Sequence, residues 1–439
     1  MAASFMFFTA GCSVFSSYPK EVEPGLRRLK NGNFDAAAEW FNKAPSKKDR
    51  SLELVEAGRV SQMAGDRKTS RKHFEEVIRR FEFREMEADV TAEKAGEQIG
   101  AILVNDNTID YRVRGYEKVM VYHHQAMNYL FDGDLDGAAV EIRRAVMAQE
   151  MELKRYEDEL EEAEEVKEDA EEGTEESAVS AVKDRYQAME KLAESVKSQF
   201  QNPYTFYLSA VVEELDDAHD NALIDYRKAQ EVVPENSFVK KDVHRLEKNR
   251  PLDVAGREVV LFVEQGFVEQ KKEVSIPIPT SKGLLKVAFP LYESSGEPAR
   301  NFELFSGTGR KLGHTEALAN ITGLAIKSLK DDAFTMVVRH VARIISKAAL
   351  QNQLDQNSEW GSLISSVWNL ISENADLRAW YTLPGAALLY RGRIPLETDK
   401  LVLKRAAKQL SLVLPEKGEL IIIKVIDVGD QLRADVISY

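Results

Sequence analysis

Small, bulky and small side chains recur in a fixed pattern along the first half of the chain. The bulky residue follows the first small one by four positions, and a second small residue follows three positions later. These steps place all three side chains on one face of a helix. The matches are Ala37, Phe41 and Ala44; Ser70, Phe74 and Val77; Ala138, Ile142 and Ala145; and Ala222, Tyr226 and Ala229. A helix with such a face must bury it against neighbours, so the pattern predicts stacked helices.

The spacing of these matches and the turns before them fit a known repeat. Ala37 and Ser70 are 33 residues apart, and Ser70 and Ala138 are 68 apart. Turn-forming residues precede the matching helices at Asn31 to Asn33, Ala64 to Asp66, and Gly133 to Asp134. The sequence resembles the tetratricopeptide repeat (TPR), whose period is about 34 residues. The resemblance implies a solenoid of helix pairs, with a degenerate repeat between residues 78 and 115. An irregular helical bundle is the alternative.

A strongly charged insertion separates the third and fourth matches. Apolar residues step by three and four along both of its halves, from Val146 to Ala163 and from Val179 to Phe200. A polar break, Glu171 to Ser177, lies between the two stripes. We expect an antiparallel coiled-coil hairpin at about 146–200 that projects from the repeats, each arm reaching about 40 Å. Such a hairpin is either a solvated spacer or a docking arm for a basic partner.

After residue 250 the pattern changes to short runs rich in Val, Ile and Phe. The expected strands are 258–263, 274–278, 285–291, 385–390, 400–403, 419–425 and 432–437. Helical spacing predicts a long helix at 314–353 and a second at 359–373. We therefore expect a multidomain chain: a TPR-like solenoid with a projecting helical hairpin over residues 25–250, then an α+β domain over 251–439 with a mostly antiparallel sheet.

The N-terminus carries the chain's one cysteine, Cys12. The run Thr9-Ala10-Gly11-Cys12 follows a short apolar stretch and resembles the lipobox of bacterial lipoproteins. The resemblance implies a signal peptide over 1–11, lipid attachment to Cys12 and a lipidated linker over 12–24. Ser13 takes the place of the Asp that signals inner-membrane retention, which implies the outer membrane. A hydrophobic tail with an incidental cysteine is the alternative.

This signal departs from the family pattern in two ways. Thr9 stands where Leu is usual, and no Lys or Arg precedes Lys20. The simplest account is a translation start upstream of Met1. The composition is ordinary for a soluble globular protein and excludes wholesale disorder: 44% of residues are hydrophobic and 30% are charged, with a net charge of -14. An acidic surface repels phosphate backbones, so we expect no nucleic-acid partner.

Three motifs resemble sites of known chemistry and fail on inspection. Asp132 to Gly137 begins like a calcium loop, but the twelfth position is Arg143, where a carboxylate is needed. Gly307 to Gly313 lacks the Gly-Lys-Ser/Thr ending of a phosphate loop. His123 and His124 are adjacent on an expected helix, so their side chains point about 100° apart and do not readily share a metal. We predict no catalytic residue, metal or cofactor, and no small-molecule substrate.

The order of parts resembles a family of bacterial outer-membrane lipoproteins with N-terminal repeats and a C-terminal β-rich domain. Asp376 to Pro384 and Arg391 suggest this resemblance; within it, Arg378 and Trp380 are core elements or a binding patch. The resemblance implies a lipid-anchored, periplasmic adaptor on the outer membrane that is not an enzyme and that binds another envelope protein. Alternatives are a regulator of a peptidoglycan synthase or envelope machine, and an enzyme on envelope polymers with a cryptic site in 251–439.

Overall fold

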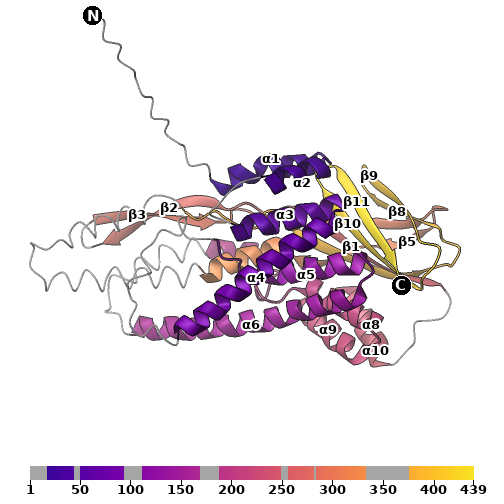
Figure 1. The fold of residues 1–439 in the computed structure, drawn as a ribbon, viewed down its shortest axis with the longest axis horizontal. Helices are drawn as coiled ribbons and strands as arrows, with labels where there is room; N and C mark the ends of the chain where they lie inside the picture. Colours follow the sequence, from indigo (N-terminus) through magenta and orange to yellow (C-terminus); the bar gives the residue numbers. More distant parts are fainter. Residues whose placement is uncertain are drawn as a thin grey trace, which may run out of the picture.

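The computed structural model describes seven stretches of the chain (Figure 1): 17–43, 50–92, 111–168, 187–248, 256–280, 283–332 and 375–439. Cys12, the predicted signal peptide and the acidic break at Glu171 to Ser177 lie outside them. So do the predicted helix at 359–373 and most of the predicted helix at 314–353.

The predicted helix pairs are confirmed, and turns of two or three residues join the members of each pair. The helices are α1 Tyr18–Lys30 and α2 Phe34–Lys43; α3 Arg50–Ala64 and α4 Arg67–Ala92; α5 Gly115–Phe131 and α6 Leu135–Glu168; α8 Pro203–Leu215 and α9 His219–Val232; and finally α10 Ser237–Glu247. Three of the turns depend on glycines with positive φ: Gly32 at 78°, Gly65 at 85° and Gly133 at 78°. The bulky residues of the repeat pattern are buried, with Phe74 and Tyr226 both 0% exposed. This part of the chain is a TPR-like helical region.

Two helical expectations need correction. Helix α4 continues unbroken to Ala92, so no turn or new repeat begins at residue 78. Helix α1 begins at Tyr18, inside the predicted linker 12–24, because Pro19 suits a first helical turn and Val22 is buried. None of the helices in the described part of the chain combines the length and apolar character that a bilayer crossing requires.

The predicted hairpin arm is half right. Its first arm is the continuation of α6, which is 34 residues long. The second arm is wrong over the described residues: a short helix at 187–192 ends in a turn at 193–195. Met189 is buried, and its sulfur accepts a hydrogen bond from the backbone N–H of Tyr292 at 3.4 Å. The side-chain amide of Gln199 donates a hydrogen bond to the carboxylate of Asp331 at 3.1 Å. Met189 therefore packs against the C-terminal half of the chain, while Phe200 lies 5.6 Å from Tyr156 of α6, and the described residues of this segment form no long helix beside α6.

The described residues of the C-terminal half form three sheets, and the expectation of mostly antiparallel strands is confirmed. The five-stranded sheet has the order β11-β10-β1-β7-β6, in which only β1 and β10 are parallel. A second sheet pairs β2 with β3, and a third has the order β5-β4-β8-β9. The strands are β1 Arg257–Gln265, β2 Lys272–Thr280, β3 Gly283–Leu291, β4 Glu303–Ser306, β5 Lys311–His314, β6 Glu316–Asn320, β7 Ala386–Ile394, β8 Lys400–Arg405, β9 Lys408–Val413, β10 Leu420–Val428 and β11 Gln431–Ser438.

The long helix predicted from residue 314 begins later. Residues 316–320 form β6, which pairs with β7 in a register that sets Ala317 opposite Leu388. Helix follows from residue 321 to residue 332. The Glu-Ala-Leu-Ala composition of β6 favours helix locally, so the pairing with β7 overrides the local preference.

The five-stranded sheet covers the inner face of the helical region. The first helices of the pairs, α3, α5 and α8, are buried nearly all round, whereas the second helices keep an exposed face. One hydrophobic cluster contains residues of α3, α5 and α8 together with residues of β1, β7 and β10. At its centre the rings of Tyr204 and Phe262 lie 5.2 Å apart. The helical and β-rich parts thus share a core, and the open concavity expected of the solenoid is filled.

Strand β11 lies along the turns of the helix pairs. Its alternate residues share one face of the strand and reach three successive turns. The contacts are Gln431 with Gly32, Arg433 with Gly65 and Ile437 with Gly133. The hydroxyl of Tyr439 then donates to the carbonyl of Leu130 at 2.6 Å. We call this contact between β11 and the turns the β11 seam.

Candidate functional site

The segment between residues 375 and 385 crosses the inner face of the helices without joining a sheet. Its backbone is held by two glutamates from successive repeats. Glu56 of α3 accepts hydrogen bonds from the N–H groups of Tyr381 at 2.8 Å and Thr382 at 3.0 Å. Glu117 of α5 accepts one from Trp380 at 3.0 Å. Three consecutive buried amides are therefore satisfied by side chains, as a segment with no strand partner requires.

Both glutamates are buried, Glu56 at 1% exposure and Glu117 at 0%. Burial raises the pKa of the Glu56 carboxyl to about 7, against hydrogen bonds that favour its ionised form. Glu117 also accepts from the Tyr111 hydroxyl at 2.6 Å and from the Arg114 backbone at 2.9 Å, which caps α5. The two carboxylates thus join the helical region to the segment that crosses it.

The residues that suggested the lipoprotein family are packed in the core. Trp380 is 0% exposed, and its ring lies 5.9 Å from the rings of both Phe74 and His124. Arg378 is buried and pairs with Asp376 at 2.9 Å. The core alternative for Trp380 and Arg378 is therefore confirmed, and the binding-patch alternative is wrong.

Arg391 on β7 is the centre of a buried ionic cluster. Its guanidinium lies 2.6 Å from Glu258 of β1, 2.6 Å from Glu214 of α8 and 3.4 Å from Asp242 of α10. It also donates to the hydroxyl of Tyr226. Neighbouring carboxylates and this hydroxyl hold the pKa of Arg391 above its usual value, despite burial. The cluster joins three helices to the sheet and offers no group to solvent.

A second buried polar cluster contains both adjacent histidines. The rings of His123 and His124 lie 5.3 Å apart at 88°, and each side chain is 0% exposed. Glu264 of β1 joins them: one ligand atom from each of the three residues lies within 4.8 Å of the others. The two histidine side chains thus lie closer to one another than their adjacent positions on a helix suggest. The reach of the side chains brings their nitrogens together although their Cβ directions diverge, and a sequence pattern gives no sign of the third ligand from β1.

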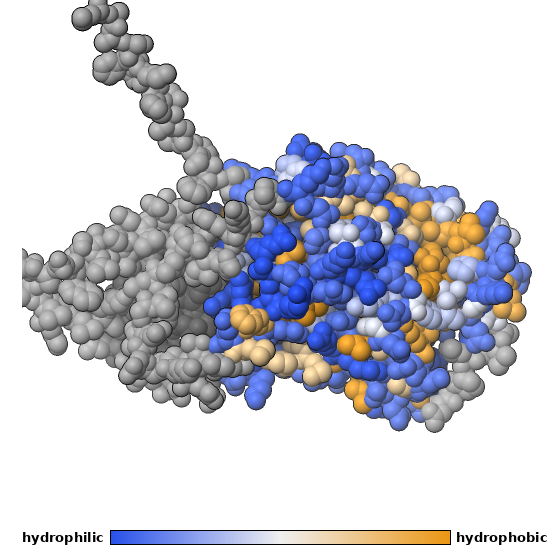
Figure 2. Space-filling view, in the orientation of Figure 1, coloured by the Kyte–Doolittle hydropathy of each residue, from blue (hydrophilic) through white to orange (hydrophobic). Residues whose placement is uncertain are grey.

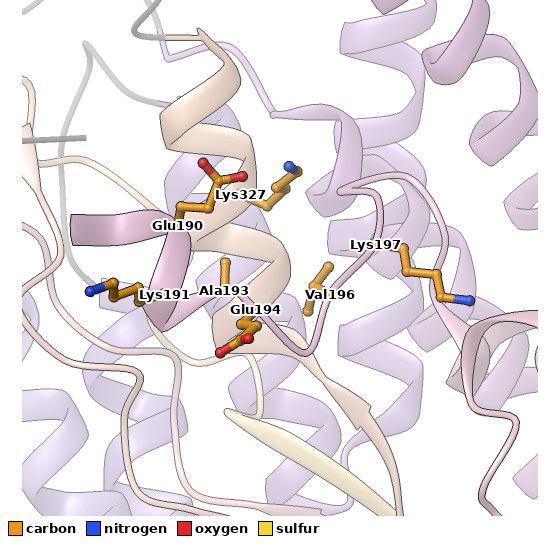
Figure 3. Close-up of a pocket in the computed structure, with 7 residues that line it drawn as sticks. All are labelled: Glu190, Lys191, Ala193, Glu194, Val196, Lys197 and Lys327. Atoms are coloured by element: carbon orange, nitrogen blue, oxygen red, sulfur yellow. The ribbon is translucent and has the colours of Figure 1, made fainter. Parts of the chain in front are cut away.

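A surface pocket lies between the 187–200 segment and the helix at 321–332 (Figure 3). It encloses about 340 Å³. Its charged side chains do not converge, because Lys191 and Lys197 point in opposite directions in Figure 3. Glu190, on the rim, is neutralised by Lys330 at 2.7 Å. A catalytic site needs polar groups aimed at one point, and this pocket does not provide them.

Apolar side chains are exposed on the outer face of the second helices. Besides Val140 (52%), four apolar residues of α4 and α6 are more than half exposed: Phe83 (60%), Met86 (68%), Met147 (58%) and Met151 (56%). Ion pairs join the two helices beside these residues, Arg144 with Glu82 at 3.5 Å and Arg155 with Glu85 at 3.4 Å. Figure 2 shows an apolar area where α4 crosses α6. We call the four residues the α4–α6 patch.

The other two motifs have structural roles. Asp132 to Gly137 forms the turn from α5 into α6, and Asp132 pairs with Arg67 at 2.6 Å. Gly307 to Gly313 forms the turn between β4 and β5 and continues into β5.

No family model and no curated protein sequence matches the chain. Among solved structures, the chain is similar to the "TPR2AB-domain:pHSP90-complex of yeast Sti1" at 17% sequence identity. The similarity covers 53% of this chain and 83% of the Sti1 chain, with a TM-score of 0.22. The helix pairs described above define the repeat region.

Proposed function

We propose that this chain is a non-enzymatic interaction scaffold, anchored by a lipid on Cys12 to the periplasmic face of the outer membrane. The α4–α6 patch carries the proposal. The inner face of the helices is filled by the chain's own sheet, so a protein partner must bind elsewhere. Exposed Phe and Met side chains next to paired charges are typical of protein interfaces.

The lengths of the helices support this binding surface. Helix α6 has 34 residues and its partner α5 has 17, or about 51 Å and 26 Å at 1.5 Å per residue. Helix α4 is likewise longer than α3, with 26 residues compared with 15. Figure 1 shows α4 and α6 running past their partners on the side where β2 and β3 lie. A partner could therefore contact the second helices without displacing the core.

Site-specific photo-crosslinking in cells tests the binding surface. A photoreactive residue at Phe83 or Met147 should capture one envelope protein. Ile224 on α9 is the matched control, because it is 50% exposed and lies off the patch. Equal capture at all three positions, or at none, would rule out the α4–α6 patch as the interface. The captured protein also decides the narrower role: a peptidoglycan synthase among the adducts would identify a regulator.

Metabolic labelling with a lipid analogue tests the anchor separately. We expect the label on the wild-type chain and its loss in Cys12→Ala, with release of the chain from the outer-membrane fraction. An unlabelled wild-type chain would refute the lipid anchor. The crosslinking test of the binding surface would remain valid, because it does not depend on the anchor.

A further inference from the structure

We propose that His123, His124 and Glu264 form a buried site for a divalent transition metal, with Zn²⁺ as the best fit. The three residues come from α5 and β1, so the ion would join the helical region to the five-stranded sheet. Two imidazoles and one carboxylate are a common zinc donor set. All three side chains are at most 1% exposed.

The unused ring nitrogens are the first argument. Nδ1 of His123 lies 3.2 Å from the hydroxyl of Thr205, and its Nε2 has no hydrogen-bond partner among the described residues. Both nitrogens of His124 are also without hydrogen-bond partners there. Metal-binding histidines typically bond a protein oxygen through one nitrogen and the metal through the other, as His123 is placed to do. Buried nitrogens with no partner are otherwise uncommon.

The distances are the second argument. Nδ1 of His124 lies 3.9 Å from Oε1 of Glu264, which is too long for a hydrogen bond. Two ligands at about 2.1 Å from a tetrahedral ion are about 3.4 Å apart, so this pair of atoms lies about half an ångström from that spacing, and all three ligand atoms lie within 4.8 Å of one another. Glu264 is already oriented: Arg59 pairs with its Oε2, and the Tyr204 hydroxyl donates to its Oε1 at 3.2 Å. Such outer contacts fix a metal-binding carboxylate.

The charge around the site permits a cation. Arg59 is paired with Glu264, and Lys424 of β10 lies 3.3 Å from Asp435 of β11. Each of these two cations therefore has a carboxylate partner.

Metal reconstitution of the full chain tests the proposal. The chain is unfolded with a chelator, refolded with Zn²⁺ or Co²⁺, freed of excess ion by gel filtration and measured by elemental analysis. We expect one equivalent per chain, a visible absorption band with Co²⁺, and a higher Tm with Zn²⁺. His123→Gln and His124→Asn should lose all three effects, whereas His219→Gln, an exposed position on α9, should keep them.

Because the first two variants alter the core, circular dichroism must show that they fold. Thr205→Val provides a second comparison that leaves every ligand in place, and we expect it to weaken zinc affinity by 10- to 100-fold, the usual effect of losing an outer contact. A folded wild-type chain that retains neither Zn²⁺ nor Co²⁺ overturns the proposal. So does a folded histidine variant that retains the ion as well as wild type.

Discussion

The guanidinium of Arg433 on β11 donates a 2.8 Å hydrogen bond to the backbone carbonyl of Ala64, the last residue of α3. Residues 369 positions apart thus join a strand to a helix turn. The bond satisfies a carbonyl that the end of α3 leaves without an intrahelical partner. It lies in the middle of the β11 seam, where the strand contacts one repeat after another. The seam therefore sets the position of the sheet along the helices.

Gly65→Ala should destabilise the chain more than Gly309→Ala. Both glycines have a φ of 85°, so both substitutions carry the same backbone strain of about 1–2 kcal/mol. A methyl group at Gly65 would lie 2.4 Å from Nη2 of Arg433, whereas nothing lies within 4 Å at Gly309. Losing the Arg433 hydrogen bond adds about 1 kcal/mol. Urea unfolding of both variants measures the difference.

Arg433→Ala provides the control for this comparison. In that background the methyl group at Gly65 has room, so the two glycine substitutions should cost the same free energy of unfolding. A difference that persists without Arg433 would mean that the seam does not depend on this contact.

Arg391→Met should destabilise the chain by about 3–5 kcal/mol, because it leaves Glu258 buried without its cation and leaves Arg245 alone to pair with both Glu214 and Asp242. Arg393→Met, two residues further along β7 and only partly buried, is the matched control and should cost less than about 1 kcal/mol. Guanidinium unfolding gives both values. Equal losses would show that the cluster contributes no more than a surface charge.

Glu56→Gln should change how stability depends on pH. The pKa of Glu56 is about 7 in the folded chain, above the usual value of 4.5, so the folded state holds the proton more tightly. The stability from this group is complete below about pH 4.5 and is lost as the pH rises through 7. The cost of Glu56→Gln should therefore be larger at pH 5 than at pH 8. If the variant loses the same free energy of unfolding, relative to wild type, at pH 5 and at pH 8, this prediction is wrong.

The helical region should not fold stably as a fragment. Residues 17–248 without the sheet would expose the inner faces of α3, α5 and α8, which contact β1 and the 375–385 segment in the full chain. We expect such a fragment to bind hydrophobic dyes and to aggregate. A monomeric fragment with a cooperative thermal transition would show instead that the solenoid is independent.

Local signals predicted the helical region well. The turn at Gly65 and the buried position of Phe74 depend on residues close by in the same helix pair. Such local features can be predicted from the sequence pattern. Strand β6 could not be found this way, because its five residues favour helix until β7 pairs with them. The second arm was predicted wrongly for the same reason, since the heptad spacing of Met189 serves packing near Tyr292.

The candidate sites were harder to predict than the fold. Glu56 and Glu117 resemble any other acidic residues on a helix, and only the segment that crosses them shows why both are buried. Glu264 lies on a strand more than a hundred residues beyond His123 and His124, so no local motif connects them. The packing of β1 against α5 brings the two histidines and Glu264 together. A sequence pattern carries no information about such packing between distant segments.

Both neighbours of β1 in its sheet are made late in synthesis. Strand β1 ends at Gln265, whereas β7 begins at Ala386 and β10 at Leu420. A ribosome adds about 5–20 residues per second, so roughly 10–30 s separate β1 from its parallel partner. During that interval the nascent helices have no covering sheet and present an apolar surface to holding chaperones. A premature stop codon before Leu420 would therefore yield a chain destined for degradation.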